Sequence, residues 1–181
     1  MTSINWKLLE TLARVENQWI SLIGERLIDE QGQSINYWRV ERSDSVIVIP
    51  VHRQQILLPK PFYRHGVGLQ TYDFPGGRHN GNKEPVDTAY QVLHRELKVK
   101  ASAVDHMTFL NPEGWLVDSS FSSQKVFAFE AHISEDASVS PEVVDISQPA
   151  NRTGAAIILE KLNCLQCRCA LMEWIVKNIA V

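Results

Sequence analysis

Apolar residues recur at helical spacing in one stretch near the middle of the chain. Pro85 suits the first turn of a helix there, because its missing N–H would have had no partner in that turn. From Val86 onward, apolar positions lie three or four residues apart, which buries one stripe of a helix. These positions are Ala89, Val92, Leu93, Leu97 and Ala101. We therefore expect an amphipathic helix that begins at Pro85.

The pattern before residue 60 predicts a short helix and two hairpins. The helix is expected over residues 5–16, where apolar residues cluster on one side: Trp6, Leu8, Leu9, Leu12 and Val15. The turn residues Asp29–Gln33 and the polar His52-Arg53-Gln54 each separate two runs of strand length. The four expected strands are Trp19–Ile28, Ser34–Arg42, Ser45–Val51 and Gln54–Leu58.

The second half of the chain is expected to alternate strands with helices. A strand over Thr71–Phe74 leads into Gly76-Gly77, which we interpret as a sharp turn before an exposed polar loop, Arg78–Lys83. Ser134–Asn151 is polar and contains prolines, so we expect a surface loop. The remaining expected elements are strands over Asp105–Leu110 and Lys125–His132 and helices over residues 154–162 and 164–180.

Length, charge and hydropathy limit the classes of partner. At 181 residues the chain is long enough for one domain with a sizeable core. The formal net charge is −3 with both signs interspersed, which gives no indication of non-specific nucleic-acid binding. No apolar run is long enough to span a bilayer, and the first ten residues lack the apolar core of a signal peptide. We expect neither a nucleic acid nor a membrane as partner.

Three cysteines lie close together, at positions 164, 167 and 169. An odd number of cysteines in one short stretch favours reduced thiols in a cytoplasmic protein over a disulfide framework. The C-x2-C-x-C run could indicate zinc, but Cys164 and Cys167 also share helical spacing with Leu171 and Trp174. We therefore interpret two of the thiols as part of a buried stripe, where cysteine acts as a small hydrophobe.

The segment from Phe74 to Ser102 resembles the Nudix box, G-x5-E-x7-R-E-U-x-E-E-x-G-U, where U is aliphatic. Phe74-Pro75-Gly76-Gly77 matches its entry turn and Arg95-Glu96-Leu97 matches its R-E-U. About four extra residues, roughly one helical turn, separate these two parts. Glu84 lies near the place of the first glutamate. Val99, Lys100 and Ser102 replace the last two glutamates and the closing glycine.

The resemblance implies a Nudix α/β/α sandwich with a mixed sheet, and a metal site on the helix. Members of the family hold Mg²⁺ or Mn²⁺ with carboxylates at i, i+3 and i+4 of one helix face. Those positions are Glu96, Val99 and Lys100 here. By resemblance, Glu96 and Glu84 would ligate metal, Arg95 would complete the catalytic set, and Glu84 would assist or pair with Arg95. Alternatively, Glu96 forms a surface ion pair with Lys100.

Substrate contacts are implied by the same resemblance. Gly76, Gly77 and Lys100 would face the substrate. Tyr63–Gly68 together with Asp73–Gly77 resembles the ADP-ribose pyrophosphatase branch, whose early hairpin pairs with a second subunit. This branch implies a homodimer in which residues 1–44 dimerise and residues 45–181 form the Nudix core.

In that branch Arg64 would hold a phosphate or ribose, since a guanidinium fork matches phosphate oxygens. Alternatively, Arg64 is a loop cation beside aromatic rings. Asp73 could touch a base or ribose, or could instead accept hydrogen bonds from backbone donors.

The loop before the last long strand supplies a catalytic acid in the ADP-ribose branch. Gln124 stands at that position, and an amide cannot act as a general base. Glu113 and Asp118 are nearby carboxylates that could substitute. Trp115 could stack on a nucleobase or act as a packing lid.

Two functions follow from the resemblance. The first is a metal-dependent Nudix pyrophosphatase that cleaves the diphosphate of a nucleoside diphosphate linked to another moiety, such as ADP-ribose or an ADP-sugar. The second is a catalytically inactive Nudix-fold protein that binds a nucleotide or regulates a partner. The glycine turn, Glu84 and Arg95-Glu96 favour the first, whereas Val99, Lys100 and Gln124 favour the second.

Overall fold

A computed structural model of the chain describes residues 6–178, and these form two compact units. The first unit comprises the chain up to Ser43 together with Leu116–Lys125. The second comprises Asp44–Trp115 and the chain from Val126 onward. Each unit is described by itself below.

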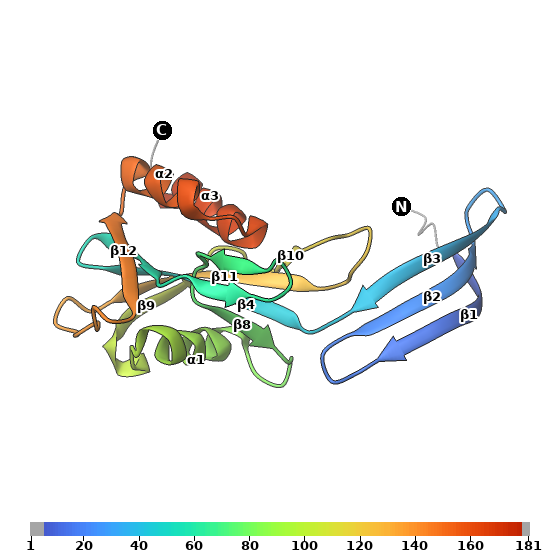
Figure 1. Ribbon diagram of the computed structural model, residues 1–181, viewed down its shortest axis with the longest axis horizontal. Coiled ribbons are helices and arrows are strands. Elements are labelled where there is room, and N and C mark those ends of the chain that lie inside the picture. The colour runs from blue at the N-terminus through green and yellow to red at the C-terminus, as the bar shows by residue number, and fades with distance from the viewer. Residues whose placement is uncertain (1–5, 179–181) are drawn as a thin grey trace. The chain divides into compact units, whose positions relative to one another are not determined.

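The first unit contains a three-stranded antiparallel sheet in the order β1-β2-β3 (Figure 1). Its strands are β1 (Lys7–Glu16), β2 (Ser21–Ile28) and β3 (Ser34–Glu41). The carboxylate of Asp29 accepts hydrogen bonds from the amides of Gln31 (2.9 Å) and Gln33 (2.8 Å), and Gly32 has a φ of 79°. These bonds confirm the hairpin that the turn residues predict between β2 and β3.

Residues 5–16 do not form the expected helix; the described part of this segment is strand β1. Pairing of β1 with β2 skips one residue between Leu8 and Glu10 and another between Thr11 and Ala13. Each extra residue is a β-bulge. Leu9 and Leu12 are the two extra residues, so the apolar positions of this segment do not follow the two-residue period of a strand. Their spacing of three residues imitates that of a helix, which is why the prediction was wrong.

The second unit is built on a seven-stranded mixed sheet, with a short two-stranded ribbon beside it. The sheet strands are β4 (Asp44–His52), β5 (Gln55–Pro59), β8 (Gly76–His79), β9 (Val104–Phe109), β10 (Trp115–Leu116), β11 (Lys125–Ile133) and β12 (Val144–Pro149). The main order is β10-β11-β4-β5-β12, with β8 also paired to β4 and β9 to β11. Only β4 and β11 run parallel among these described pairs. The ribbon is β6 (Phe62–Arg64) and β7 (Leu69–Thr71).

Helices cover both faces of this sheet. The helices are α1 (Pro85–Leu97), α2 (Arg152–Lys161) and α3 (Leu165–Asn178), with a 3-10 turn, η1 (Ala101–Ala103). α1 lies on one side of the sheet and α2 and α3 lie on the other (Figure 1). Val46 and Val48 belong to the same buried cluster as Leu93 and Leu97 of α1. On the opposite side the indole of Trp174 donates to the buried carboxylate of Glu130 at 2.6 Å. The expected α/β/α sandwich with a mixed sheet is confirmed.

Several local predictions have clear outcomes. Arg53 and Gln54 have φ values of 47° and 58° and form a two-residue turn, which confirms the hairpin expected between β4 and β5. The strand expected over Thr71–Phe74 is wrong in its position, because β7 ends at Thr71 and the next strand begins at Gly76. The expected loop over Ser134–Asn151 contains β12, which pairs antiparallel with β5.

The sequence did not predict β12, because the segment is polar and contains prolines, which are typical of a loop, although its apolar and polar residues alternate. Its residues are half-buried and exposed in turn, as expected of an edge strand whose one side faces the protein.

No helix in the described part of the chain is long and apolar enough to cross a membrane.

Candidate functional site

Gly76 and Gly77 do not form the expected turn; they are paired residues of strand β8. They lie opposite Ile47 and Val46 of β4. A Cβ on Gly77 would lie 3.0 Å from Cγ2 of Val92 and 3.3 Å from the guanidinium nitrogens of Arg95. Glycine is therefore needed here because helix α1 approaches the strand closely.

Arg95 ties the end of α1 to this strand. Its Nη2 donates to the carbonyl oxygen of Gly76 at 2.6 Å and lies 2.5 Å from Oε1 of Glu96. The Glu96 side chain is 30% exposed, so this ion pair faces solvent in part. The structure thus brings Arg95, Glu96 and Gly76 together, and Glu96 pairs with Arg95 and not with Lys100.

The helix ends too early for the expected carboxylate face. Lys98 adopts a left-handed conformation with a φ of 60°, and its N–H bonds to the carbonyl of His94 at 3.1 Å, which caps α1 at Leu97. Val99 is 3% exposed and belongs to the core cluster. Lys100 is exposed and precedes η1. The expectation that Glu96, Val99 and Lys100 share one helix face is therefore wrong.

Glu84 lies at the opposite end of α1 from Glu96. It is the residue before the first helical position, and its side chain makes no capping hydrogen bond. Glu96 follows it by 12 residues, which is about 18 Å of helical rise. A single Mg²⁺ has its ligands at about 2.1 Å. Glu84 and Glu96 cannot ligate one ion, and Glu84 cannot pair with Arg95; both expectations are corrected.

The donors around Glu96 do not fit a divalent-metal site. Among residues 6–178, three metal-ligating side chains converge at one place, formed by Asp73, Cys164 and Cys167. Glu96 is not part of that group, and its carboxylate already faces a guanidinium. Mg²⁺ and Mn²⁺ prefer several hard oxygen ligands. No catalytic step through a metal follows from these residues.

Arg64 is held within the protein by Asp73. Its Nε and Nη2 lie 2.8 Å and 2.7 Å from Oδ2 of Asp73, and its guanidinium lies 5.4 Å from the ring centre of Phe62. The hydroxyl of Thr71 donates to the same carboxylate oxygen at 3.0 Å. Arg64 therefore lies beside an aromatic ring, as the alternative interpretation expected. Asp73 accepts hydrogen bonds from the side chains of Arg64 and Thr71, whereas one of its two interpretations expected backbone donors.

The residues of the loop before β11 have structural partners within their own unit. Gln124 is 2% exposed, and its amide donates to the carbonyl of Ser43 at 3.0 Å. Asp118 accepts hydrogen bonds from the amide and hydroxyl of Ser120. Trp115 lies in β10 and is half-buried. Its role in substrate binding stays a prediction.

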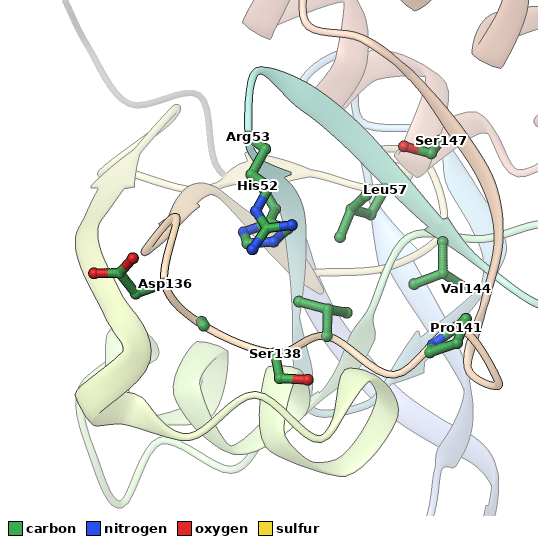
Figure 2. A pocket seen from close by; sticks show the side chains of 10 residues that line it. His52, Arg53, Leu57, Asp136, Ser138, Pro141, Val144 and Ser147 are labelled. Carbon is green, nitrogen blue, oxygen red and sulfur yellow. The ribbon is translucent and has the colours of Figure 1, made fainter.

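A pocket of about 360 Å³ lies in the second unit, at the β4–β5 turn (Figure 2). It is lined by His52, Arg53, Leu57, Asp136, Ala137, Ser138, Val139, Pro141, Val144 and Ser147. Nε of Arg53 donates to the carbonyl of Glu135 at 2.9 Å, which ties the turn to the loop between β11 and β12. This pocket has no local sequence signal, because its two walls are about 80 residues apart along the chain and meet only through strand pairing.

Comparisons with known proteins show what the fold is. No protein-family model matches the chain, and no curated protein matches its sequence. Among solved structures, the chain is similar to the crystal structure of an ADP compounds hydrolase, with a TM-score of 0.73 and 17% sequence identity. The similarity covers 96% of this chain and 94% of that chain. The chain therefore has the same mixed α/β fold as that hydrolase.

Proposed function

We propose that this protein is a Nudix-type hydrolase that cleaves the diphosphate of a nucleoside diphosphate linked to another moiety. ADP-ribose and ADP-sugars are the first substrates to test. The observation that carries the proposal is the fold similarity to an ADP compounds hydrolase over nearly the full length of both chains. The contact of Arg95 with the Gly76 carbonyl and with Glu96 supports it, since these residues match the most specific part of the motif.

We also propose that this hydrolysis depends on a divalent metal ion. Glu96 is one carboxylate, and among the described residues it belongs to no group of three or more metal-ligating side chains. Mg²⁺ in such enzymes is often held by one or two carboxylates together with waters and substrate phosphates. An ion at Glu96 would therefore have to be bound jointly with the phosphates of the substrate.

A second candidate function is nucleotide binding without hydrolysis. One specific observation favours it: the left-handed cap at Lys98 ends α1, and Val99 is buried in the core where a metal ligand would be needed. In this alternative the protein keeps the fold and a ligand site of the same chemical class. It would act as a sensor or as a regulatory partner.

One experiment separates the two candidates. The full chain is incubated with ADP-ribose, ADP-sugars, dinucleotides and nucleoside triphosphates, with Mg²⁺, with Mn²⁺ or with a chelator, and the products are separated by chromatography. Glu96→Gln is compared with Glu142→Gln, which alters an exposed carboxylate between β11 and β12. Melting temperatures are recorded with the same compounds.

The three outcomes have different meanings. Metal-dependent turnover that is lost in Glu96→Gln and retained in Glu142→Gln supports the hydrolase. No turnover, with a melting temperature raised by one class of nucleotide, supports the binding protein. If the protein shows no turnover and no compound raises its melting temperature, both candidates are contradicted.

We further propose that the protein is a homodimer that associates through the three-stranded sheet of the first unit. Large apolar side chains on and beside β1–β3 are exposed to solvent in the single chain. They are Trp6, Leu8, Leu9, Leu12, Val15, Trp19, Ile20 and Trp38. Apolar surface of this kind commonly marks an interface with another protein. A second copy of the chain is the partner that the resemblance to the ADP-ribose branch implies. We also propose that the protein is located in the cytoplasm.

A further inference from the structure

Two thiols and a carboxylate converge at the start of helix α3. The sulfur atoms of Cys164 and Cys167 and a carboxylate oxygen of Asp73 all lie within 4.8 Å of one another. We propose that Cys164 and Cys167 form a reversible dithiol–disulfide pair that exchanges with low-molecular-weight disulfides, with Asp73 as the proton acceptor for Cys167. This redox site is independent of the function proposed above.

The local geometry brings the two sulfurs together. α3 begins at Leu165, and the carbonyl of Cys164 accepts the first helical hydrogen bond, from the amide of Arg168 at 3.0 Å. Cys164 is therefore the residue that caps the helix, and Cys167 lies one turn further on the same side. Residues spaced in this way can be joined by a disulfide without unwinding the helix.

Cys164 has the properties of the attacking thiol. It is half-buried, so a small disulfide can reach it. The hydrogen bond from Cys167 lowers the pKa of Cys164 to about 6, and the backbone amides of Cys167 and Gln166 contribute in the same direction. Burial and the charge of Asp73 oppose this shift. A thiolate is thus present at neutral pH, and the thiolate is the form that attacks a disulfide.

Cys167 has the properties of the second, resolving thiol. It is 2% exposed, and its bond to Cys164 and its burial raise its pKa well above the usual range. Its sulfur lies 3.9 Å from Oδ1 of Asp73, so its single proton can be donated either to Cys164 or to this carboxylate. The other oxygen of Asp73 is occupied by Arg64 and Thr71. Oδ1 is therefore directed at the one proton that must leave before the disulfide can close.

The exchange balances in two steps. The Cys164 thiolate attacks one sulfur of the small disulfide, forms a mixed disulfide with it and releases one small thiolate. Cys167 loses its proton to Asp73 and attacks the Cys164 sulfur. The protein disulfide then forms, and the second small thiolate leaves and takes up the proton. The protein is oxidised by two electrons, and the small disulfide is reduced to one thiolate and one thiol.

Two features favour this chemistry over a zinc site. Structural zinc is bound by four ligands in a tetrahedron, whereas the group found among the described residues has three members. Asp73 is also paired with the guanidinium of Arg64, which would lie close to any cation bound there. The experiment below therefore also tests whether these three residues bind zinc instead.

The test uses the full chain and its natural protease sites. The reduced protein is equilibrated in glutathione buffers of graded potential, its free thiols are blocked with iodoacetamide, and it is digested with trypsin. Cleavage after Lys161 and Arg168 yields one peptide, Leu162–Arg168, that holds Cys164 and Cys167, while Cys169 falls in the next peptide. Cys169, on the same helix and exposed, is the internal reference.

We expect the peptide Leu162–Arg168 to carry two carbamidomethyl groups after reducing buffer and none after oxidising buffer, where its mass should be two hydrogen atoms below that of the unmodified dithiol. Return to reducing buffer should reverse the change. Cys167→Ser should stop the reaction at the mixed disulfide on Cys164, and Cys164→Ser should remove the reaction at this peptide. Cys169→Ser should leave it unchanged. Asp73→Asn should slow closure of the disulfide at least about tenfold while mixed-disulfide formation continues, since proton acceptance by a positioned group contributes about that much or more.

The pH dependence gives a second readout. The groups facing Cys164 are Cys167 and Asp73; Arg64 pairs with Asp73, and Arg168 donates to the carbonyls of Leu159 and Leu162. The rate of Cys164 alkylation should reach half its maximum near pH 6, where the pKa of Cys164 lies.

Three results would each overturn the proposal. One is a peptide that keeps both thiols in every buffer. Another is a mixed disulfide that forms at Cys169 in preference to Cys164. The third is a reduced protein that binds one Zn²⁺ and thereby protects both thiols from alkylation.

Discussion

At the scale of single residues, the approach of α1 to β8 depends on Gly77. The Arg95 guanidinium and a methyl group of Val92 occupy the space that a side chain at this position would need. Gly77→Ala should therefore lower the free energy of unfolding by about 1–3 kcal/mol, because a methyl group forced into packed structure displaces its neighbours. Urea unfolding measures this difference.

Gly66→Ala is the matched control for Gly77→Ala. A Cβ at Gly66 meets no atom within 4 Å, and Gly66 does not have a positive φ. This variant should be as stable as the natural protein or slightly more stable, because alanine restricts the unfolded chain. Equal stability of the two alanine variants would contradict the close packing of α1 on Gly77.

A partly buried ion pair makes the first unit sensitive to acid. The Arg39 guanidinium lies 2.9 Å and 3.1 Å from the two carboxylate oxygens of Glu25, which is buried. This bond holds the pKa of Glu25 below its usual value. Because the pKa is lower in the folded state, the stabilisation is complete above the unfolded pKa of about 4.3 and is lost as the pH falls through the folded value.

Glu25→Gln should therefore be less stable than the natural protein near neutral pH, and the difference should shrink as the pH falls from about 5 to 3. Glu30→Gln, which alters an exposed carboxylate in the β2–β3 turn, should show no such convergence. Urea unfolding at several pH values provides the measurement. A difference that stays constant with pH would show that the ion pair contributes nothing through the charge of Glu25.

At the scale of elements, the end of α1 at Leu97 determines where the side chains of the Nudix-like motif after this point lie. Val99 is part of the core cluster and Lys100 is exposed, although the two are neighbours in sequence. Val99→Glu should lower the free energy of unfolding by about 3 kcal/mol or more, because it buries a charge without a partner. Lys100→Glu should change it by no more than about 0.5 kcal/mol, as surface substitutions usually do.

The pair of variants also tests whether the family's carboxylates can be restored. If Val99→Glu folds as well as the natural protein and gains Mg²⁺ affinity, position 99 faces the site and the placement of Val99 in the core is wrong. Thermal unfolding with and without Mg²⁺ distinguishes these results. We expect a melting temperature lower by roughly 6 °C or more for Val99→Glu, and no metal-dependent shift in either variant.

At the scale of the whole molecule, the exposed apolar residues of the first unit indicate how copies of the chain associate. Leu12 lies on β1, at the second bulge, and is exposed in the single chain. Leu12→Glu should weaken self-association about tenfold or more, because it replaces an apolar contact with a charge. Val176→Glu alters an exposed apolar residue of α3 and should leave association unchanged.

Light scattering after size-exclusion chromatography, over a range of protein concentrations, measures the dissociation of the dimer. A protein that is monomeric at every concentration would contradict the proposed homodimer. So would a dimer that Val176→Glu dissociates and Leu12→Glu does not.

The parts of the fold that could be predicted are those with a local signal. The start of α1 followed from Pro85 and from apolar residues at helical spacing, and both hairpin turns followed from their turn residues. Strand β1 was not predicted because two bulges altered the spacing of its apolar residues, and β12 was not predicted because half of its residues face solvent. In both strands the pairing partner, and not the strand's own sequence, determines the structure.

By itself, the sequence determined the α/β class, the amphipathic helix that begins at Pro85, and Arg95-Glu96 at the end of that helix, because each depends on residues within a few positions of one another. The tertiary structure alone decided that Val99 is buried, that Glu84 and Glu96 lie far apart, and that Asp73 meets a pair of thiols. Asp73 and Cys167 are 94 residues apart in the chain, and only the packing of α3 against the segment before β8 brings them into contact. Such contacts have no local pattern, because they form only when separate elements fold onto one sheet.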